Sequence, residues 1–202
     1  MNQDKRLYFP AASRNIDPIL NVLKNHVPQS GAALEIASGS GEHICAFARR
    51  FPNLTWHPSD IEADHIDSIN AHRLVHGLEN ILPACHLDVL QQGWDVPAMD
   101  FIFNANMIHI SPKSCTNALI DGVANILKPK GVFFIYGPFF REGYATAPSN
   151  ISFDESLRQR NPEWGIRQLE DVIAISKQNS LPLVDVVEMP SNNLSVIFQK
   201  RD

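Results

Sequence analysis

The sequence predicts an α/β fold, a three-layer sandwich in which helices cover both faces of a mostly parallel, seven-stranded sheet. Short apolar runs alternate with amphipathic helical segments along most of the 202 residues. The last two apolar runs have only a turn at residues 190–193 between them, which indicates a C-terminal antiparallel hairpin. No repeat or change of composition divides the chain, so we expect one domain over residues 1–202.

The first half of the chain is predicted to hold an N-terminal helix and three strands. Apolar residues recur at i, i+3, i+4 and i+7 from Ile16 to Val27, and they predict a helix with Asn15 as its cap and Pro18 in its first turn. This helix lies in an N-terminal segment, residues 1–30. The elements expected next are a buried strand at residues 32–37, a helix at 42–50, a strand at 54–57, a helix at 61–76 and a strand at 81–87.

The second half is predicted to complete the sheet around one insertion. Ser111 and Pro112 mark a helix start, because Ser offers a capping oxygen and Pro needs no N–H in the first turn. Periodicity lapses over residues 138–165, which we interpret as a lid. The expected elements are a strand at 99–105, a helix that ends at 128–131, a strand at 132–136, the lid, a helix at 167–178 and strands at 183–188 and 194–199.

Composition excludes two classes of protein. Seventeen Lys and Arg against 22 Asp and Glu give a net charge of −5, which argues against nucleic acid as a partner. No apolar run exceeds five residues, whereas a membrane span needs about 20. The N-terminus lacks the apolar stretch of a secretory signal, and three widely spaced cysteines form no disulfide framework, so we expect a cytoplasmic protein.

The strongest functional signal is a Gly-rich turn that follows the first strand. Gly39 and Gly41 join this strand to a helix, an arrangement that lets a ligand approach the backbone and the N–H groups of the helix start. Asp60 ends the second strand about 20 residues later, where a carboxylate can accept hydrogen bonds from ribose hydroxyls. A dinucleotide-binding loop would have a third glycine at Ile44, so NAD is disfavoured.

This arrangement resembles the class I S-adenosylmethionine (SAM) methyltransferases. Residues 87–89 match the segment of that family that flanks the adenine, and residues 104–107 match the segment that holds the methionine moiety. Ala37 departs from the family, which often has a glycine there. The resemblance implies a Rossmann-like methyltransferase fold, SAM as cofactor with S-adenosylhomocysteine as product, and a cofactor site made of Glu35, Ala37, Ser38, Gly39, Gly41, Asp60, Ile61, Leu87, Asp88, Val89 and Asn104.

Three further segments resemble a smaller methyltransferase-like family that is catalogued as a domain of unknown function. They are residues 9–15 (Phe-Pro-Ala-Ala-Ser-Arg-Asn), residues 104–111 (Asn-Ala-Asn-Met-Ile-His-Ile-Ser) and residues 136–139 (Tyr-Gly-Pro-Phe). This resemblance spans nearly the whole chain and implies no particular substrate.

Several candidate site residues have two interpretations. Glu35 is either a buried structural carboxylate or, as the resemblance implies, a partner of the cofactor ammonium through water. Asp88 either caps the following segment or contacts the adenine amino group. His109 is either a general base at the mouth of the crevice or a residue that orders Ser111 and the helix start.

Substrate contacts are expected from the two segments outside the core and from the ends of the strands. The candidates are Tyr8, Arg14, Met107, Tyr136 and Arg141. The N-terminal segment has a simple docking role as its alternative, and the lid aromatics have packing against the sheet. His65, His72 and His76 fall near one helix face without a carboxylate or cysteine to complete a set, so no metal site is predicted.

The sequence therefore favours a SAM-dependent methyltransferase that acts on a small-molecule acceptor and has no nucleic-acid or membrane partner. The alternative is a non-catalytic SAM-binding protein that serves as a partner subunit or sensor. The motifs identify a cofactor and no acceptor.

Overall fold

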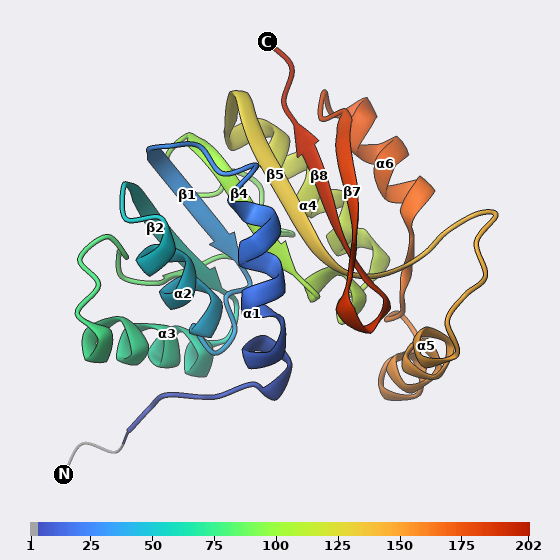
Figure 1. Cartoon of the computed structure of the whole chain (residues 1–202), viewed down its shortest axis with the longest axis horizontal. Helices are drawn as coiled ribbons and strands as arrows, with labels where there is room; N and C mark the ends of the chain where they lie inside the picture. The colour runs from blue at the N-terminus through green and yellow to red at the C-terminus, as the bar shows by residue number, and fades with distance from the viewer. Residues whose placement is uncertain (1–3) are drawn as a thin grey trace.

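The computed structural model describes residues 4–202, so the first three residues of the N-terminal segment lie outside the described chain. One sheet forms the centre of the molecule, with helices on both of its faces (Figure 1). Its strands are β1 (Gly31–Ile36), β2 (Leu54–Asp60), β3 (Cys85–His86), β4 (Met99–Ala105), β5 (Leu127–Phe140), β6 (Arg167–Gln168), β7 (Leu183–Met189) and β8 (Asn193–Gln199). The helices are α1 (Pro10–Leu23), α2 (Glu42–Arg50), α3 (Ala63–His76), α4 (Lys113–Ile126), α5 (Pro148–Arg160) and α6 (Leu169–Gln178).

The strand order is β3-β2-β1-β4-β5-β8-β7, and β6 pairs with β5. All pairs are parallel except β5 with β8 and β7 with β8, so the predicted fold class and the C-terminal antiparallel hairpin are confirmed. The sheet has eight strands rather than seven because the two-residue β6 joins the end of β5. The strand order reverses between β1 and β4, and such switch points leave a ligand crevice at the carboxyl ends of the strands.

Two apolar cores lie on opposite faces of this sheet. In β4, Phe101 and Phe103 belong to one core and Ile102 to the other, as the alternation of side chains along a strand requires. The first core holds buried residues of α1, α2 and α3, and the second holds buried residues of α4 and α6. Within residues 4–202, no helix has both the length and the apolar character needed to cross a membrane.

The helix boundaries differ from the prediction at two places. Helix α1 begins at Pro10, not after Asn15, so Asn15 and Pro18 are both inside it. Asn15 is buried and bonds to another helix, a use that its preference for caps does not reveal. Helix α4 starts at Lys113 without a side-chain cap, because the Ser111 hydroxyl lies 3.6 Å from the Met107 sulfur instead.

Strand lengths and the lid also differ. The third strand contracts from residues 81–87 to Cys85–His86, with an isolated bridge from Ile81 to Trp56. Strand β5 runs on to Phe140, well beyond the predicted 132–136, because β8 pairs with it as far as Pro138 and β6 pairs with its last two residues. The lid is not irregular throughout, since α5 occupies residues 148–160.

Candidate functional site

The turn between β1 and α2 has three residues in the left-handed backbone region: Ala37 (φ 57°), Gly39 (φ 57°) and Gly41 (φ 92°). A Cβ atom on Gly41 would lie 2.9 Å from the Cα atom of Ile69 in α3, so this glycine allows α2 and α3 to pack closely. A Cβ atom on Gly39 would lie 3.1 Å from the Phe9 ring. Gly41 thus serves helix packing, whereas Gly39 leaves room for the Phe9 ring.

Asp60 at the end of β2 holds this turn in place. Its Oδ2 accepts a hydrogen bond from the Gly39 N–H at 2.8 Å, and its Oδ1 accepts one from the Glu62 N–H at 3.0 Å. His65 Nδ1 lies 3.1 Å from the same Oδ1. A carboxylate has about four acceptor positions, so the buried Asp60 retains capacity for one further donor.

Glu35 near the end of β1 is a buried acid without a full set of partners. Its Oε2 has no hydrogen-bond partner within the described chain, and its Oε1 lies 3.8 Å from His43 Nδ1. Burial raises the pKa of Glu35 to about 8, the Ser38 hydroxyl opposes this shift, and the charge of Asp60 adds to it. Glu35 therefore carries a proton at neutral pH in the free protein.

The neighbouring His43 fixes the environment of Glu35. Its Nε2 lies 2.6 Å from the Oδ1 atom of Asn15, an acceptor, so the ring proton is on Nε2. Burial lowers the pKa of His43 to about 4, so the imidazole is neutral and offers Glu35 only the lone pair of Nδ1. His43 therefore does not supply the positive charge that would stabilise a Glu35 carboxylate.

Two residues in and just after β4, Asn104 and His109, also have polar atoms without hydrogen-bond partners among the described residues. Asn104 at the end of β4 donates from Nδ2 to the Ile36 carbonyl at 3.0 Å, while its Oδ1 has no partner within residues 4–202. His109 is completely buried, and neither ring nitrogen bonds to another described residue. Its ring packs edge-on against Phe139, and a Cβ atom on Gly137 would lie 2.6 Å from its Nε2.

The burial of His109 corrects its predicted position at the mouth of the crevice. Burial, and secondarily the charge of Arg167, lower the pKa of His109 to about 3. A base with so low a pKa accepts a proton poorly near neutral pH. The alternative role for His109 was to order Ser111. The Ser111 hydroxyl bonds to the Met107 sulfur and not to the imidazole.

Four more of the predicted cofactor residues directly follow the carboxyl ends of β2 and β3. Ile61 is half exposed, Leu87 is buried, and Asp88 and Val89 are partly buried. One Asp88 oxygen accepts a hydrogen bond from the Leu90 N–H at 2.9 Å, so this residue does cap the following turn. Ser38 is buried and donates to the Glu35 carbonyl at 3.2 Å.

The N-terminal segment covers the Gly-rich turn through a residue that the sequence did not single out. Glu42, at the start of α2, accepts hydrogen bonds from the Phe9 N–H, the Ser13 hydroxyl and the Ser40 hydroxyl, at 2.7, 2.7 and 2.8 Å. Partial burial opposes ionisation, but these hydrogen bonds lower the pKa of Glu42 below its ordinary value. The S-x-E pattern at residues 40–42 was the available signal, since an acid in the first turn of a helix often binds nearby donors.

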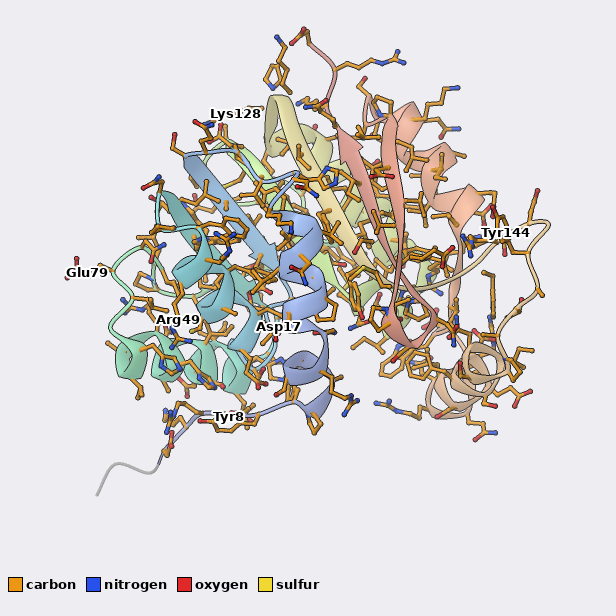
Figure 2. The ribbon with its side chains drawn as sticks, viewed as in Figure 1. Tyr8, Asp17, Arg49, Glu79, Lys128 and Tyr144 are labelled. Carbon is orange, nitrogen blue, oxygen red and sulfur yellow. The ribbon has the colours of Figure 1, made fainter. Side chains whose placement is uncertain are left out.

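The predicted substrate residues do not converge on one place. Tyr8 packs edge-on against His72 of α3, and Arg14 is exposed on α1. Tyr136 is buried and its hydroxyl accepts a hydrogen bond from Asn193, whereas Met107 is partly buried. Figure 2 shows Tyr8 and the lid residue Tyr144 far apart on the molecule.

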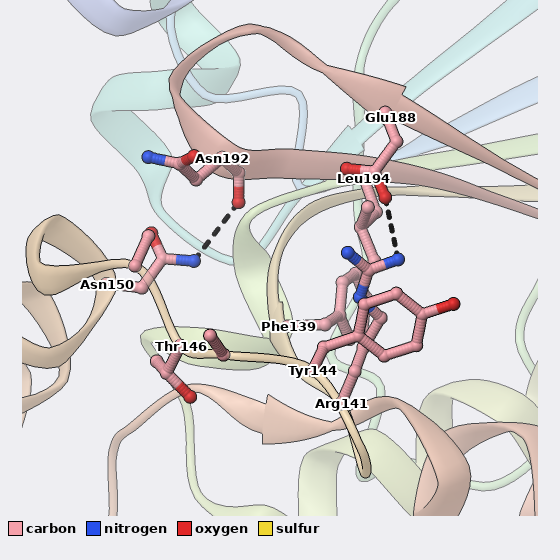
Figure 3. Close-up of a pocket in the computed structure, with 10 residues that line it drawn as sticks. Phe139, Arg141, Tyr144, Thr146, Asn150, Glu188, Asn192 and Leu194 are labelled. Atoms are coloured by element: carbon pink, nitrogen blue, oxygen red, sulfur yellow. Dashed lines mark hydrogen bonds and ion pairs between the residues drawn. The ribbon is translucent and has the colours of Figure 1, made fainter.

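Arg141 is the predicted substrate residue that lines a cavity, one of about 80 Å³ at the end of β5. Figure 3 shows its guanidinium between Glu188, at 2.7 Å, and the ring of Tyr144, whose centroid lies 3.9 Å away. Asn150 of α5 donates to the Asn192 carbonyl at 3.1 Å on the opposite wall. These contacts attach the lid to the β7–β8 turn.

The residues present fit a cationic nucleoside such as SAM. Among residues 4–202, Glu35 Oε2 and Asn104 Oδ1 are buried acceptors without a donor, near the ends of two adjacent strands. An ammonium group brings donors and charge, and Asp60 retains capacity for a ribose hydroxyl. Gly39 itself carries no side chain, and the Phe9 ring is the neighbour nearest to the position of its missing Cβ atom.

A family model described as a protein of unknown function, DUF938, matches residues 6–200. The chain belongs to the DUF938 family. This assignment confirms the resemblance to a family without a known function.

The DUF938 chain also has the fold of solved SAM-dependent methyltransferases. An O-methyltransferase family protein from Burkholderia thailandensis aligns with a TM-score of 0.81 and 14% identity, over 95% of this chain and 59% of that one. An O-methyltransferase family 2 protein from Planctomyces limnophilus, in complex with apigenin, aligns with a TM-score of 0.79 and 17% identity, over 94% of this chain and 58% of that one. Human N-acetylserotonin methyltransferase, in complex with SAM, aligns with a TM-score of 0.77 and 12% identity, over 95% of this chain and 53% of that one. The DUF938 chain thus spans somewhat more than half the length of these proteins.

Proposed function

We propose that the chain binds SAM and transfers its methyl group to a small-molecule acceptor. The observation that carries this proposal is the buried Glu35, whose Oε2 lacks a partner among the described residues at the carboxyl edge of the sheet. A buried acid in this state is costly, and a cationic ligand removes the cost.

Each part of the site has a distinct task in this proposal. Glu35 holds the ammonium group, through water, Asp60 binds the ribose, and the turn at Gly39 admits the ligand close to the backbone. Ile61, Leu87, Asp88 and Val89 flank the adenine, and Asn104 lies beside the methionine moiety. SAM supplies an activated methyl group, so the protein mainly aligns the acceptor, and alignment can lower a barrier by about 7–11 kcal/mol.

The site needs no general base from His109. That residue is buried, and burial lowers its pKa to about 3, so in the free protein it is a poor proton acceptor near neutral pH. The acceptor therefore reaches the site with a free lone pair, as an amine, thiolate or ionised hydroxyl does, or loses its proton to water. Bound SAM would supply the methyl group to that lone pair and would leave as S-adenosylhomocysteine.

The acceptor is proposed to be small. The acidic net charge disfavours a polyanion, and the names of two of the solved structures include small molecules, apigenin and N-acetylserotonin. Arg141 and Tyr144 at the end of β5 would contact it. A cytoplasmic location, which the odd number of cysteines favours, is part of this proposal.

The test is the release of S-adenosylhomocysteine from SAM across a panel of amines, phenols, thiols and carboxylic acids, with product masses read by mass spectrometry. We expect at least one acceptor to gain 14 mass units, and Asp60→Ala to lose that activity. SAM binding without turnover over the whole panel would favour the alternative, a SAM-binding subunit or sensor. Absence of both binding and turnover contradicts the proposal.

A further inference from the structure

A second and larger cavity, of about 290 Å³, lies on the other side of the end of β5. Helices α4, α5 and α6 contribute its walls, together with Phe140 and the strand β6. None of the residues expected to bind SAM or its acceptor lines it. This cavity is therefore separate from the proposed methyl-transfer site, and its chemistry has to be read from its own residues.

Arg167 of β6 is the central residue of this cavity. It is only 8% exposed, and its guanidinium donates to three neutral acceptors: the Ser111 carbonyl at 2.5 Å, the Gly165 carbonyl at 3.0 Å and the Thr116 hydroxyl at 3.2 Å. No carboxylate of residues 4–202 lies within 4.0 Å of it. A guanidinium has five N–H groups, so two remain for a ligand.

A buried cation without an anion is costly, whereas a carboxylate or phosphate forms strong charge-assisted bonds with guanidinium. Arg158 and Lys113 also line the cavity, and each already has an acidic partner, Asp154 at 2.7 Å and Asp171 at 3.3 Å. Glu163 and Asp171 are the acids on the wall, so the cations there outnumber the carboxylates by three to two.

The helix directions reinforce this charge. Lys113 is the first residue of α4 and Thr116 is the fourth, and Gln168 immediately precedes α6. Both helices therefore begin at the cavity, where the positive ends of their dipoles favour an anion. Helix starts alone would not define a site, but here they surround a buried guanidinium that lacks a counter-ion.

We propose that this cavity binds the carboxylate or phosphate group of a small molecule, with Arg167 as its principal contact and Arg158 at its rim. The proposal is independent of SAM binding. Occupancy would also be transmitted to the loop after β4, because Arg167 holds the Ser111 carbonyl and the Gly165 N–H donates to the His109 carbonyl at 3.0 Å.

The test is an NMR titration of the ¹⁵N-labelled full chain with sodium phosphate and, separately, sodium acetate, at constant ionic strength. We expect saturable shifts of the Arg167 side-chain N–H and of the Thr116 and Gln168 amides with at least one anion. The anion that saturates at the lower concentration identifies the preferred group. No saturable shift with either anion, or shifts confined to the Gly39–Gly41 turn, would overturn the proposal.

Variants separate a built site from general charge screening. Arg167→Gln should weaken binding at least about tenfold, the loss expected for charged hydrogen bonds. Arg158→Gln should weaken it about threefold, whereas Arg160→Gln, which removes the same charge from α5 outside the cavity, should leave it unchanged. If Arg167→Gln fails to fold, the Arg158 and Arg160 pair decides, and equal effects from these two variants would contradict the site.

Discussion

Glu35 connects the protonation state of the protein to its proposed cofactor. Its pKa is raised from 4.5 to about 8 mainly by burial, so the folded state holds a proton that the unfolded state has released between these two pH values. The folded state binds more protons in this window, and its stability therefore falls as pH rises from about 4.5 to 8. A cation beside Glu35 would favour the ionised carboxylate over the protonated acid, so Glu35 would release its proton.

Glu35→Gln tests this coupling, because the amide has the shape of the protonated acid and cannot ionise. At pH 8 we expect the free variant to be more stable than the wild type by at least about 1.4 kcal/mol, the equivalent of one pKa unit, and at pH 4, below both pKa values, to be nearly equal. Urea unfolding at the two pH values measures the difference. Glu79→Gln, on an exposed loop, is the matched control, and a variant of equal stability at both pH values contradicts the raised pKa.

The same substitution should weaken SAM binding and change its dependence on pH. Wild-type affinity should rise between pH 6 and pH 8, since less free protein then has to lose a proton, whereas the affinity of Glu35→Gln should stay flat. Calorimetry in HEPES and in Tris, which differ in ionisation enthalpy, counts the released protons. If the wild type releases none at pH 7, Glu35 is not the group that meets the ammonium.

Asp60 has the other direct role at the residue scale. Asp60→Ala should weaken SAM binding by about 1.5–3 kcal/mol, the value of a hydrogen bond to a charged group. It should also lower stability, because the Gly39 and Glu62 N–H groups lose their acceptor. Calorimetric titration measures the first effect and urea unfolding the second. An unchanged affinity would mean that the ribose lies elsewhere.

At the scale of elements, the contact between α2 and α3 depends on Gly41. Gly41→Ala places a methyl group 2.9 Å from the Ile69 backbone at a left-handed φ, so we expect a loss of about 2–4 kcal/mol from strain and overpacking together. Gly77→Ala is the control, because Gly77 is also left-handed (φ 58°) but has open space around it, and it should cost only about 1–2 kcal/mol. Equal losses in urea unfolding would show that the helices adjust freely.

Glu42 is one of the anchors of the N-terminal segment, at the start of α1. Glu42→Gln replaces a charged acceptor of three hydrogen bonds, and at this partly exposed position we expect a loss of about 1 kcal/mol. The Phe9 amide, which donates directly to Glu42, should exchange its hydrogen several-fold faster. Glu79→Gln should leave that rate unchanged. A Phe9 amide that exchanges at the same rate in both variants would place the anchor elsewhere.

For the molecule as a whole, apolar periodicity and turn residues were sufficient to predict the sheet and its C-terminal hairpin. They could not predict α5, because only Asn150 and Leu157 of that helix are buried and no apolar stripe marks it. The start of α1 was missed because Asn15 has the chemistry of a cap but bonds to His43, a contact 28 residues away. Such pairings are visible only once the chain is folded.

The candidate site divides in the same way. The glycines, Asp60 and Glu35 follow from local motifs because each stands at a strand end. The burial of His109 and the anchoring by Glu42 follow from packing between distant elements, which spacing along the chain does not encode. The net charge of −5 argued against a polyanionic partner. A net charge does not reveal a single buried cation such as Arg167, which has no carboxylate partner among the described residues.

Calorimetric titration of the wild-type chain with SAM would show whether this fold binds SAM at the Gly-rich turn. We expect saturable binding of one SAM per chain, tighter at pH 8 than at pH 6. S-adenosylhomocysteine, which retains the ammonium and ribose, should compete for the same site. An absence of binding heat for both compounds at high micromolar concentrations, at either pH, would contradict SAM binding at this turn.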